Sequence, residues 1–229
     1  DVDLVDARDS LDSAEGVGAE HVAHAAAGSG HGHVDLDSPA MRAFYAELAE
    51  RKTIVDPTLV VWEGSLTSDG SAITPAYAAF ADISPPEVSR SWKIGGYPLF
   101  DGLTRDDFRA SFAKMAGLIA RLHKAGVRIV AGTDGYGLEL VRELELYQQA
   151  GLTNEEALQT ATIIPARTTG MADRFGSIET GKTASMILIN GDASKDLGAL
   201  RRVTTVFLDG YRLDGAALRE ASGFSGAPK

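Results

Sequence analysis

The sequence predicts an α/β fold with a parallel sheet, and three observations lead to this expectation. Strand-like and helix-like segments alternate through the middle of the chain, as in βα units. Residues 127–131 form a short apolar run closed by Gly132-Thr133-Asp134, the pattern of a buried strand. The helix candidates also carry their own start signals, so the alternation does not depend on hydrophobicity alone.

The first part of the chain is expected to hold two helices and two strands. Ser38 is a good N-cap, and Pro39 suits the first position of the helix that follows. The predicted elements are a helix over 6–16, a strand over 21–24, a loop over 25–32, a helix over 39–52 and a strand over 53–59.

Residues 60–101 differ from the rest, because they are rich in Gly, Ser and Pro and hold both tryptophans, Trp62 and Trp92. We interpret them as a long irregular segment, and such segments in compact domains are usually functional or mobile. Thr104 is then expected to cap a helix over 105–125, which leads into the strand over 127–131.

The last third changes from long helices to short strands with glycine turns. Helices are predicted over 138–150 and 153–164, the second started by a capping box of Thr153 and Glu156. Short strands are predicted over 176–178, 184–190 and 204–213, followed by a C-terminal helix. This change of character indicates a second structural unit.

Composition excludes several classes of function. The 229 residues carry a net charge of −10, which disfavours binding to nucleic acid or to anionic membranes. No apolar run of about 18 residues occurs, so we expect no transmembrane helix. The compartment is undetermined from the residues, and a soluble, cytoplasmic protein is the expectation. The chain has no cysteine, so a metal must be held by His, Asp, Glu or a modified Lys. No GxSxG, P-loop or GxGxxG motif occurs.

Asp134 is the strongest candidate for chemistry. A carboxylate at the C-terminal end of a buried parallel strand can bind a divalent metal and accept a proton from water. The alternative is that Asp134 only caps the helix that starts near residue 138, and the motif alone does not decide between the two.

Histidines supply the other candidates. His21 and His24 are spaced i,i+3, so on a strand they face opposite sides, and His24 is nearer the C-terminal end. The alternative for His24 is a packed core residue. His31 and His33 share one face, but the small residues over 25–30 before them form no rigid support for a metal site.

Four segments in a fixed order carry a resemblance to a known family. They are residues 127–134 (VRIVAGTD), 138–153 (LELVRELELYQQAGLT), 155–170 (EEALQTATIIPARTTG) and 176–190 (GSIETGKTASMILIN), preceded by 18–24 (GAEHVAH). Together they resemble the C-terminal part of an amidohydrolase-superfamily chain, of the imidazolonepropionase and prolidase-like kind.

The resemblance implies an architecture. Residues 1–170 would form the second half of a (β/α)8 TIM-type barrel, with residues 60–101 as an insert over the barrel mouth. Residues 171–229 would form part of a small composite β-sandwich and a C-terminal helix packed on the exterior. The first-strand HxH pair, the fourth-strand bridging residue and the fifth-strand His of the family have no counterpart in this sequence, which therefore resembles a fragment.

The resemblance also implies a site. His24 and Asp134 would bind one or two divalent ions, zinc by expectation, and Asp134 would be the base for the attacking water. Trp62, Trp92 and Tyr97 in the insert would line the pocket for a small-molecule or peptide substrate, or else only pack the insert onto the barrel.

The expected reaction is hydrolysis of a C–N bond in an amide, cyclic amide or peptide. The alternative is a catalytically inactive fragment, or a non-enzymatic binding or scaffold module of the same fold. Members of this group often associate, so the resemblance also allows a homo-oligomer.

Overall fold

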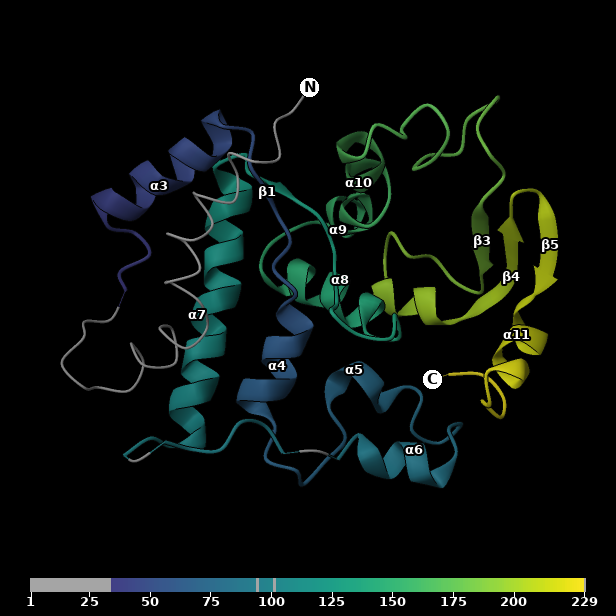
Figure 1. The fold of residues 1–229 in the computed structure, drawn as a ribbon, viewed down its shortest axis with the longest axis horizontal. Coiled ribbons are helices and arrows are strands. Elements are labelled where there is room, and N and C mark those ends of the chain that lie inside the picture. The colour runs from purple at the N-terminus through teal and green to yellow at the C-terminus, as the bar shows by residue number, and fades with distance from the viewer. Residues whose placement is uncertain (1–33, 94, 101, 229) are drawn as a thin grey trace.

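The structure is a computed structural model that describes residues 34–93, 95–100 and 102–228. Figure 1 shows a group of helices around a short parallel pair of strands, with a small antiparallel sheet at the opposite end. In chain order the described elements are α3 (Pro39–Glu50), β1 (Ile54–Val55), α4 (Leu59–Thr67), α5 (Pro75–Ala78), α6 (Pro86–Ser91), α7 (Arg105–Lys124), β2 (Arg128–Ile129), α8 (Leu140–Gln149), α9 (Asn154–Thr160), α10 (Ile163–Thr168), β3 (Met186–Ile189), the 3-10 helix η2 (Leu197–Arg201), β4 (Val203–Leu208), β5 (Tyr211–Asp214) and α11 (Gly215–Ala221).

The helix starts expected from local signals are confirmed. The Ser38 hydroxyl accepts from the Met41 N–H at the start of α3. Thr104 begins α7 with a full capping box, and Thr153 begins α9 in the same way. These signals act within one turn of chain, so they determine the local structure without help from distant residues.

Parallel pairing is confirmed for one strand pair in the described part of the chain. β1 and β2 pair in parallel, with Ile54 beside Arg128 and Val55 beside Ile129, and α7 is the helix between them. The strands are shorter than the predicted ranges 53–59 and 127–131. On the β1 side the reason is local, because Pro57 has no N–H and Thr58 has a left-handed φ of 48°.

The interpretation of residues 60–101 as a long irregular segment is wrong for the three helices that the segment contains. They contain most of α4, all of α5 and all of α6. Leu59 and Leu66 of α4 are fully buried, and α4 packs along α7, as Figure 1 shows. The apolar residues of α4 therefore belong to the core rather than to a loop.

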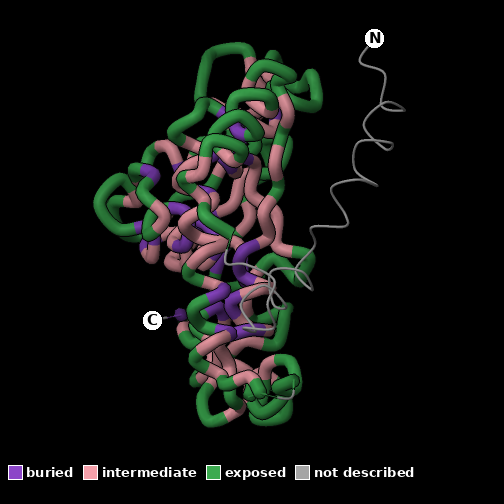
Figure 2. Tube along the Cα trace, turned by 90° about the vertical axis from the view of Figure 1, so that its left-hand side faces the viewer, coloured by how far each residue is buried: buried purple, intermediate pink, exposed green. Residues whose placement is uncertain are grey.

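The core lies between α4, α7, α8 and the parallel strands. Its most deeply buried side chains include Leu59, Leu144, Leu146 and Tyr147, and Ile129 of β2 joins them. Figure 2 shows the buried positions gathered along the middle of the molecule, with exposed turns on the outside. This packing fixes the ends of β1 and β2.

The C-terminal sheet is antiparallel with the order β3-β4-β5. The strand predicted over 204–213 is a hairpin instead, because Asp209 and Gly210 both adopt positive φ in a tight turn between β4 and β5. The strand predicted over 176–178 is wrong: those residues form bends and a coil, and Gly176 lies close against the Ile163 backbone.

The predicted C-terminal helix is present as α11, which Asp214 caps by accepting from the Ala217 N–H. Beyond it, the chain returns to residues 80–83. The Ser225 N–H donates to the Ile83 carbonyl at 2.7 Å, and the Phe80 and Phe224 rings lie 5.9 Å apart. None of the helices in the described ranges is long and apolar enough to cross a membrane.

Candidate functional site

Asp134 lies just beyond the C-terminal end of β2, with a left-handed φ of 46°. Its side chain is exposed and makes no hydrogen bond or ion pair among the residues that the structure describes. The N-cap of α8 is Glu139, which makes no side-chain capping bond either. The helix-cap alternative for Asp134 is therefore wrong, and its carboxylate is available for other contacts.

A cavity of about 630 Å³ opens beside Asp134. Its walls come from α4, from α5 and the chain around α6, and from the loop between β2 and α8. Trp92 and Tyr97 line it together with Asp134, whereas Trp62, on α4, does not. The structure thus brings three of the sequence-predicted residues together at one opening and leaves Trp62 apart.

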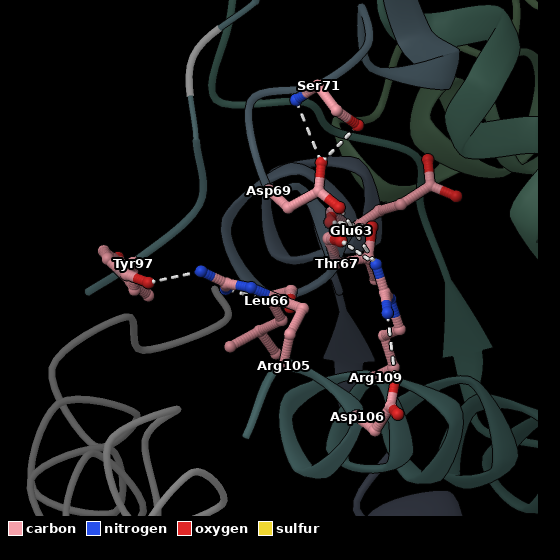
Figure 3. A network of polar contacts seen from close by, with 9 residues as sticks. All are labelled: Glu63, Leu66, Thr67, Asp69, Ser71, Tyr97, Arg105, Asp106 and Arg109. Carbon is pink, nitrogen blue, oxygen red and sulfur yellow. Dashed lines mark hydrogen bonds and ion pairs between the residues drawn. The ribbon is translucent and has the colours of Figure 1, made fainter. Parts of the chain in front are cut away.

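A network of polar contacts anchors the Tyr97 wall of this cavity, and Figure 3 shows it from close by. The Arg105 guanidinium donates to the carbonyl of Tyr97 at 2.9 Å and to that of Leu66 at 3.3 Å. The Tyr97 N–H donates to the Ser65 carbonyl at 2.7 Å. Tyr97 is therefore tied to α7 on one side and to α4 on the other.

Gly96 is required at this contact. A Cβ atom on Gly96 would lie 2.2 Å from the Ser65 carbonyl oxygen, so any side chain would push the two segments apart. Arg109 of α7 adds two ion pairs to the same network of polar contacts. Its guanidinium lies 2.9 Å from a carboxylate oxygen of Asp106 and 3.5 Å from one of Asp69. The wall is therefore held by backbone contacts as well as by charged side chains.

Glu139 is a cavity residue that the sequence reasoning missed. It is only 5% exposed, and the Tyr77 hydroxyl donates to its Oε1 atom. The Tyr77 ring stacks on Trp92 with 4.8 Å between centroids and an interplanar angle of 6°. Burial, helped by the bond to Glu139 and by its charge, raises the pKa of Tyr77 above its usual range. Tyr77 therefore stays protonated and acts as the donor.

Asp56, at the C-terminal end of β1, explains the glycine of the Gly132-Thr133-Asp134 motif. A Cβ atom on Gly132 would lie 2.1 Å from the Asp56 Oδ2 atom. The carboxylate of one parallel strand thus occupies the space beside the backbone of the next. Asp56 was also missed, although an Asp at a strand end (TIVDPTL) carries the same signal as Asp134.

Glu143 fixes the start of α4 from a distance. Its two carboxylate oxygens accept from the Leu59 N–H at 2.8 Å and the Val60 N–H at 2.6 Å. Thr58, at the N-cap position, makes no side-chain capping bond, so Glu143 takes over that role. Burial raises the pKa of Glu143, against the lowering effect of its hydrogen bonds to Tyr147 and to these two amides.

His24, His21, His31 and His33 lie outside the described residues. Within the described ranges no group of three or more His, Asp or Glu side chains could hold a metal ion. Asp134 fits as one oxygen ligand of such a site, because its carboxylate is exposed to the cavity. A complete ligand set needs residues beyond those described.

The family model that describes the amidohydrolase family matches residues 18–213. The chain belongs to the amidohydrolase family. Members generally use divalent metal ions, and the family with its solved relatives implies a TIM-barrel-like fold. The described residues themselves form an α/β structure with small sheets.

The match to similar proteins covers only part of the length of each of those proteins. A 5-methylthioadenosine/S-adenosylhomocysteine deaminase from Thermodesulfovibrio yellowstonii is 33% identical over 85 residues, 31% of this chain and 19% of the relative. A Xaa-Pro dipeptidase structure is 22% identical, with a TM-score of 0.53 over 78% of this chain and 38% of that one. An amidohydrolase structure is 21% identical, with a TM-score of 0.50 over 76% and 37%.

The chain thus spans about a fifth of the curated relative and well under half of the solved ones.

Proposed function

We propose that the protein is a metal-dependent hydrolase that cleaves a C–N bond in an amide, cyclic amide or peptide. The observation that carries this proposal is Asp134, an exposed carboxylate without a partner among the described residues. It lies at the end of a parallel strand beside a cavity, in a chain of the amidohydrolase family. Active sites of barrel enzymes lie at this end of the strands. The deaminase and dipeptidase relatives act on C–N bonds, which supports the reaction class.

We propose His24 and Asp134 as metal ligands, with zinc as the metal and one or two ions bound. When bound, a divalent ion lowers the pKa of water and polarises a carbonyl oxygen. Asp134 suits this role because carboxylate oxygen is a zinc ligand and no protein group competes for it within the described ranges. The remaining ligands would come from outside those ranges.

In the proposed reaction Asp134 accepts a proton from the attacking water and passes it to the leaving nitrogen. Trp92 and Tyr97 hold the substrate against the strand ends and exclude bulk water. The supporting architecture that we propose is a half barrel over residues 1–170 with residues 60–101 at its mouth, and a partial β-sandwich with a helix over 171–229.

Substitution of Asp134 tests the proposal. In the metal-loaded protein, Asp134→Asn should lower kcat for dipeptide or cyclic amide hydrolysis by at least about 100-fold, the usual effect of losing a general base. Asp173→Asn is the matched control, because Asp173 is exposed and lies outside the cavity. Dialysis against a chelator should abolish activity, and added zinc should restore it. Unchanged hydrolysis by Asp134→Asn would remove Asp134 from the mechanism.

A second candidate is a chain of this fold that is inactive by itself. The lack of a three-ligand metal group in the described ranges favours it, because a catalytic zinc normally needs three protein ligands. Elemental analysis of the purified chain separates the two. Zinc bound at a molar ratio near one supports the enzyme, and binding far below that ratio supports the inactive alternative.

A further inference from the structure

The Glu139 carboxylate has an unused acceptor inside the cavity wall. Its Oε2 atom is buried and has no hydrogen-bond partner among the described residues, while Oε1 receives the Tyr77 hydroxyl. Buried polar groups in native proteins are almost always paired, because an unpaired one costs free energy. An orphaned carboxylate oxygen beside a cavity therefore indicates a missing partner that is a hydrogen-bond donor.

Gly135 allows the Glu139 carboxylate to lie against the backbone at the edge of the cavity. A Cβ atom on Gly135 would lie 2.6 Å from Oε1 and 3.2 Å from Oε2 of Glu139, so a side chain there would displace the carboxylate. Gly135 lines the same cavity as Glu139 and Asp134. The position of the carboxylate beside the cavity therefore depends on this glycine.

The charge of the cavity specifies what kind of donor fits. Its charged lining residues are Asp134 and Glu139, and no Lys, Arg or His lines it within the described ranges. Asp134 is the proposed metal ligand, so Glu139 supplies the carboxylate charge that remains for the substrate, and a carboxylate without a basic neighbour favours a positively charged group over a neutral or anionic one. The rings of Tyr77, Trp92 and Tyr97 line the same space, and aromatic faces also attract cations.

We propose that Glu139 is a substrate-binding residue that selects substrates with a cationic nitrogen group, an ammonium or a guanidinium. The group would donate to Oε2 while Tyr77 holds Oε1, and the scissile C–N bond would lie toward Asp134. This inference rests on the proposed hydrolase function, because it assigns the substrate class of the same cavity.

Hydrolysis of matched substrates tests the selection. The pairs are dipeptides that differ only in arginine against citrulline, or lysine against norleucine, each placed at either position. The wild-type protein should prefer the charged member in kcat/KM by about 10- to 100-fold, the range for one charge-assisted hydrogen bond. Glu139→Gln should remove this preference, so that the ratio of kcat/KM for the charged member to kcat/KM for the neutral member falls to about one.

A second variant keeps the test valid if Glu139→Gln fails to fold. Gly135→Ala retains the carboxylate and places a methyl group in front of it, so it should also lose the preference for the charged member. Retention of the preference in Gly135→Ala would contradict the proposed contact with the Glu139 carboxylate, because the new methyl group must displace that carboxylate. A wild-type protein that hydrolyses charged and neutral members equally well would overturn the inference while leaving the hydrolase proposal standing.

Binding without turnover separates the two proposals. Agmatine, which carries a guanidinium and an ammonium but no scissile amide, should bind the wild-type protein by calorimetry and bind Glu139→Gln about 10- to 100-fold more weakly. Agmatine binding in a protein that hydrolyses none of the dipeptides would support the cation site and count against the hydrolase. No difference between wild type and Glu139→Gln would refute the cation site directly.

Discussion

Glu143 allows a sharp test of how the cavity wall is supported. It is fully buried and accepts from two amides at the start of α4, a helix that supplies one wall of the cavity. Glu143→Ala would leave the Leu59 and Val60 N–H groups buried without a partner. We expect this substitution to lower the free energy of unfolding of the protein, and the N-terminal turn of α4 to unfold first.

The expected loss of stability in Glu143→Ala follows from the two amide N–H groups that lose their acceptor. Each buried N–H left without an acceptor costs about 1–3 kcal/mol, so two cost about 4 kcal/mol. For a domain of this size that corresponds to a fall in Tm of about 8–16 °C. Glu143→Gln should cost less than Glu143→Ala, because it keeps the shape of the side chain and one acceptor.

The pH dependence has a defined sign. Burial raises the pKa of Glu143, so the folded state holds its proton more tightly than the unfolded state does. The stability from this group is fully present below the usual Glu pKa and is lost as pH rises through the raised value. The difference in the free energy of unfolding between wild type and Glu143→Ala should therefore decrease as pH rises from the usual Glu pKa through the raised pKa of Glu143.

Urea unfolding at several pH values measures both effects. Glu47→Ala is the control, because Glu47 lies on the exposed side of α3 and its ion pair with Arg51 is exposed. Its free energy of unfolding should change by less than about 0.5 kcal/mol. The role assigned to Glu143 would be refuted if Glu143→Ala lowered the free energy of unfolding by less than about 1 kcal/mol. A difference from wild type that increases with pH would refute it as well.

Two further predictions concern neighbouring contacts. Gly132→Ala should cost about 1–3 kcal/mol in urea unfolding, because its Cβ meets the Asp56 carboxylate, and Asp56→Ala in the same chain should recover most of the loss. Arg142→Met breaks a buried ion pair with Glu63, whose closest atoms are 2.6 Å apart, and should cost about 3–5 kcal/mol. Adding Glu63→Met should restore part of that stability, and no recovery would contradict the pairing.

Local signals account for what the sequence could predict. The capping boxes and the apolar run before Asp134 act within a few residues, so they can be interpreted without a structure. The position of Asp134 at a strand end needed only that run and its closing motif. The predicted ligand His24 lies outside the described residues and stays a prediction.

Distant partners account for what the sequence could not predict. Helix α4 was missed because its cap, Glu143, is 84 residues from Leu59, and no local N-cap precedes it. Glu139 was interpreted only as part of a helix start, since its partner Tyr77 is 62 residues away. Side chains that meet across the fold leave no periodic pattern in the sequence, whereas helices with local caps do.

The contact of Phe224 and Ser225 with residues 80–83 has a practical consequence. Figure 1 shows this tail beside α5, where Ser225 and Phe224 hold Ile83 and Phe80. The same stretch leads through α6 to Trp92 at the cavity. Truncating the chain before Phe224, or fusing a bulky purification tag there, would disrupt the contacts of Phe224 and Ser225 with Phe80 and Ile83. The segment that leads to the proposed substrate cavity would then lose this support. Affinity tags for biochemical work are therefore better placed elsewhere.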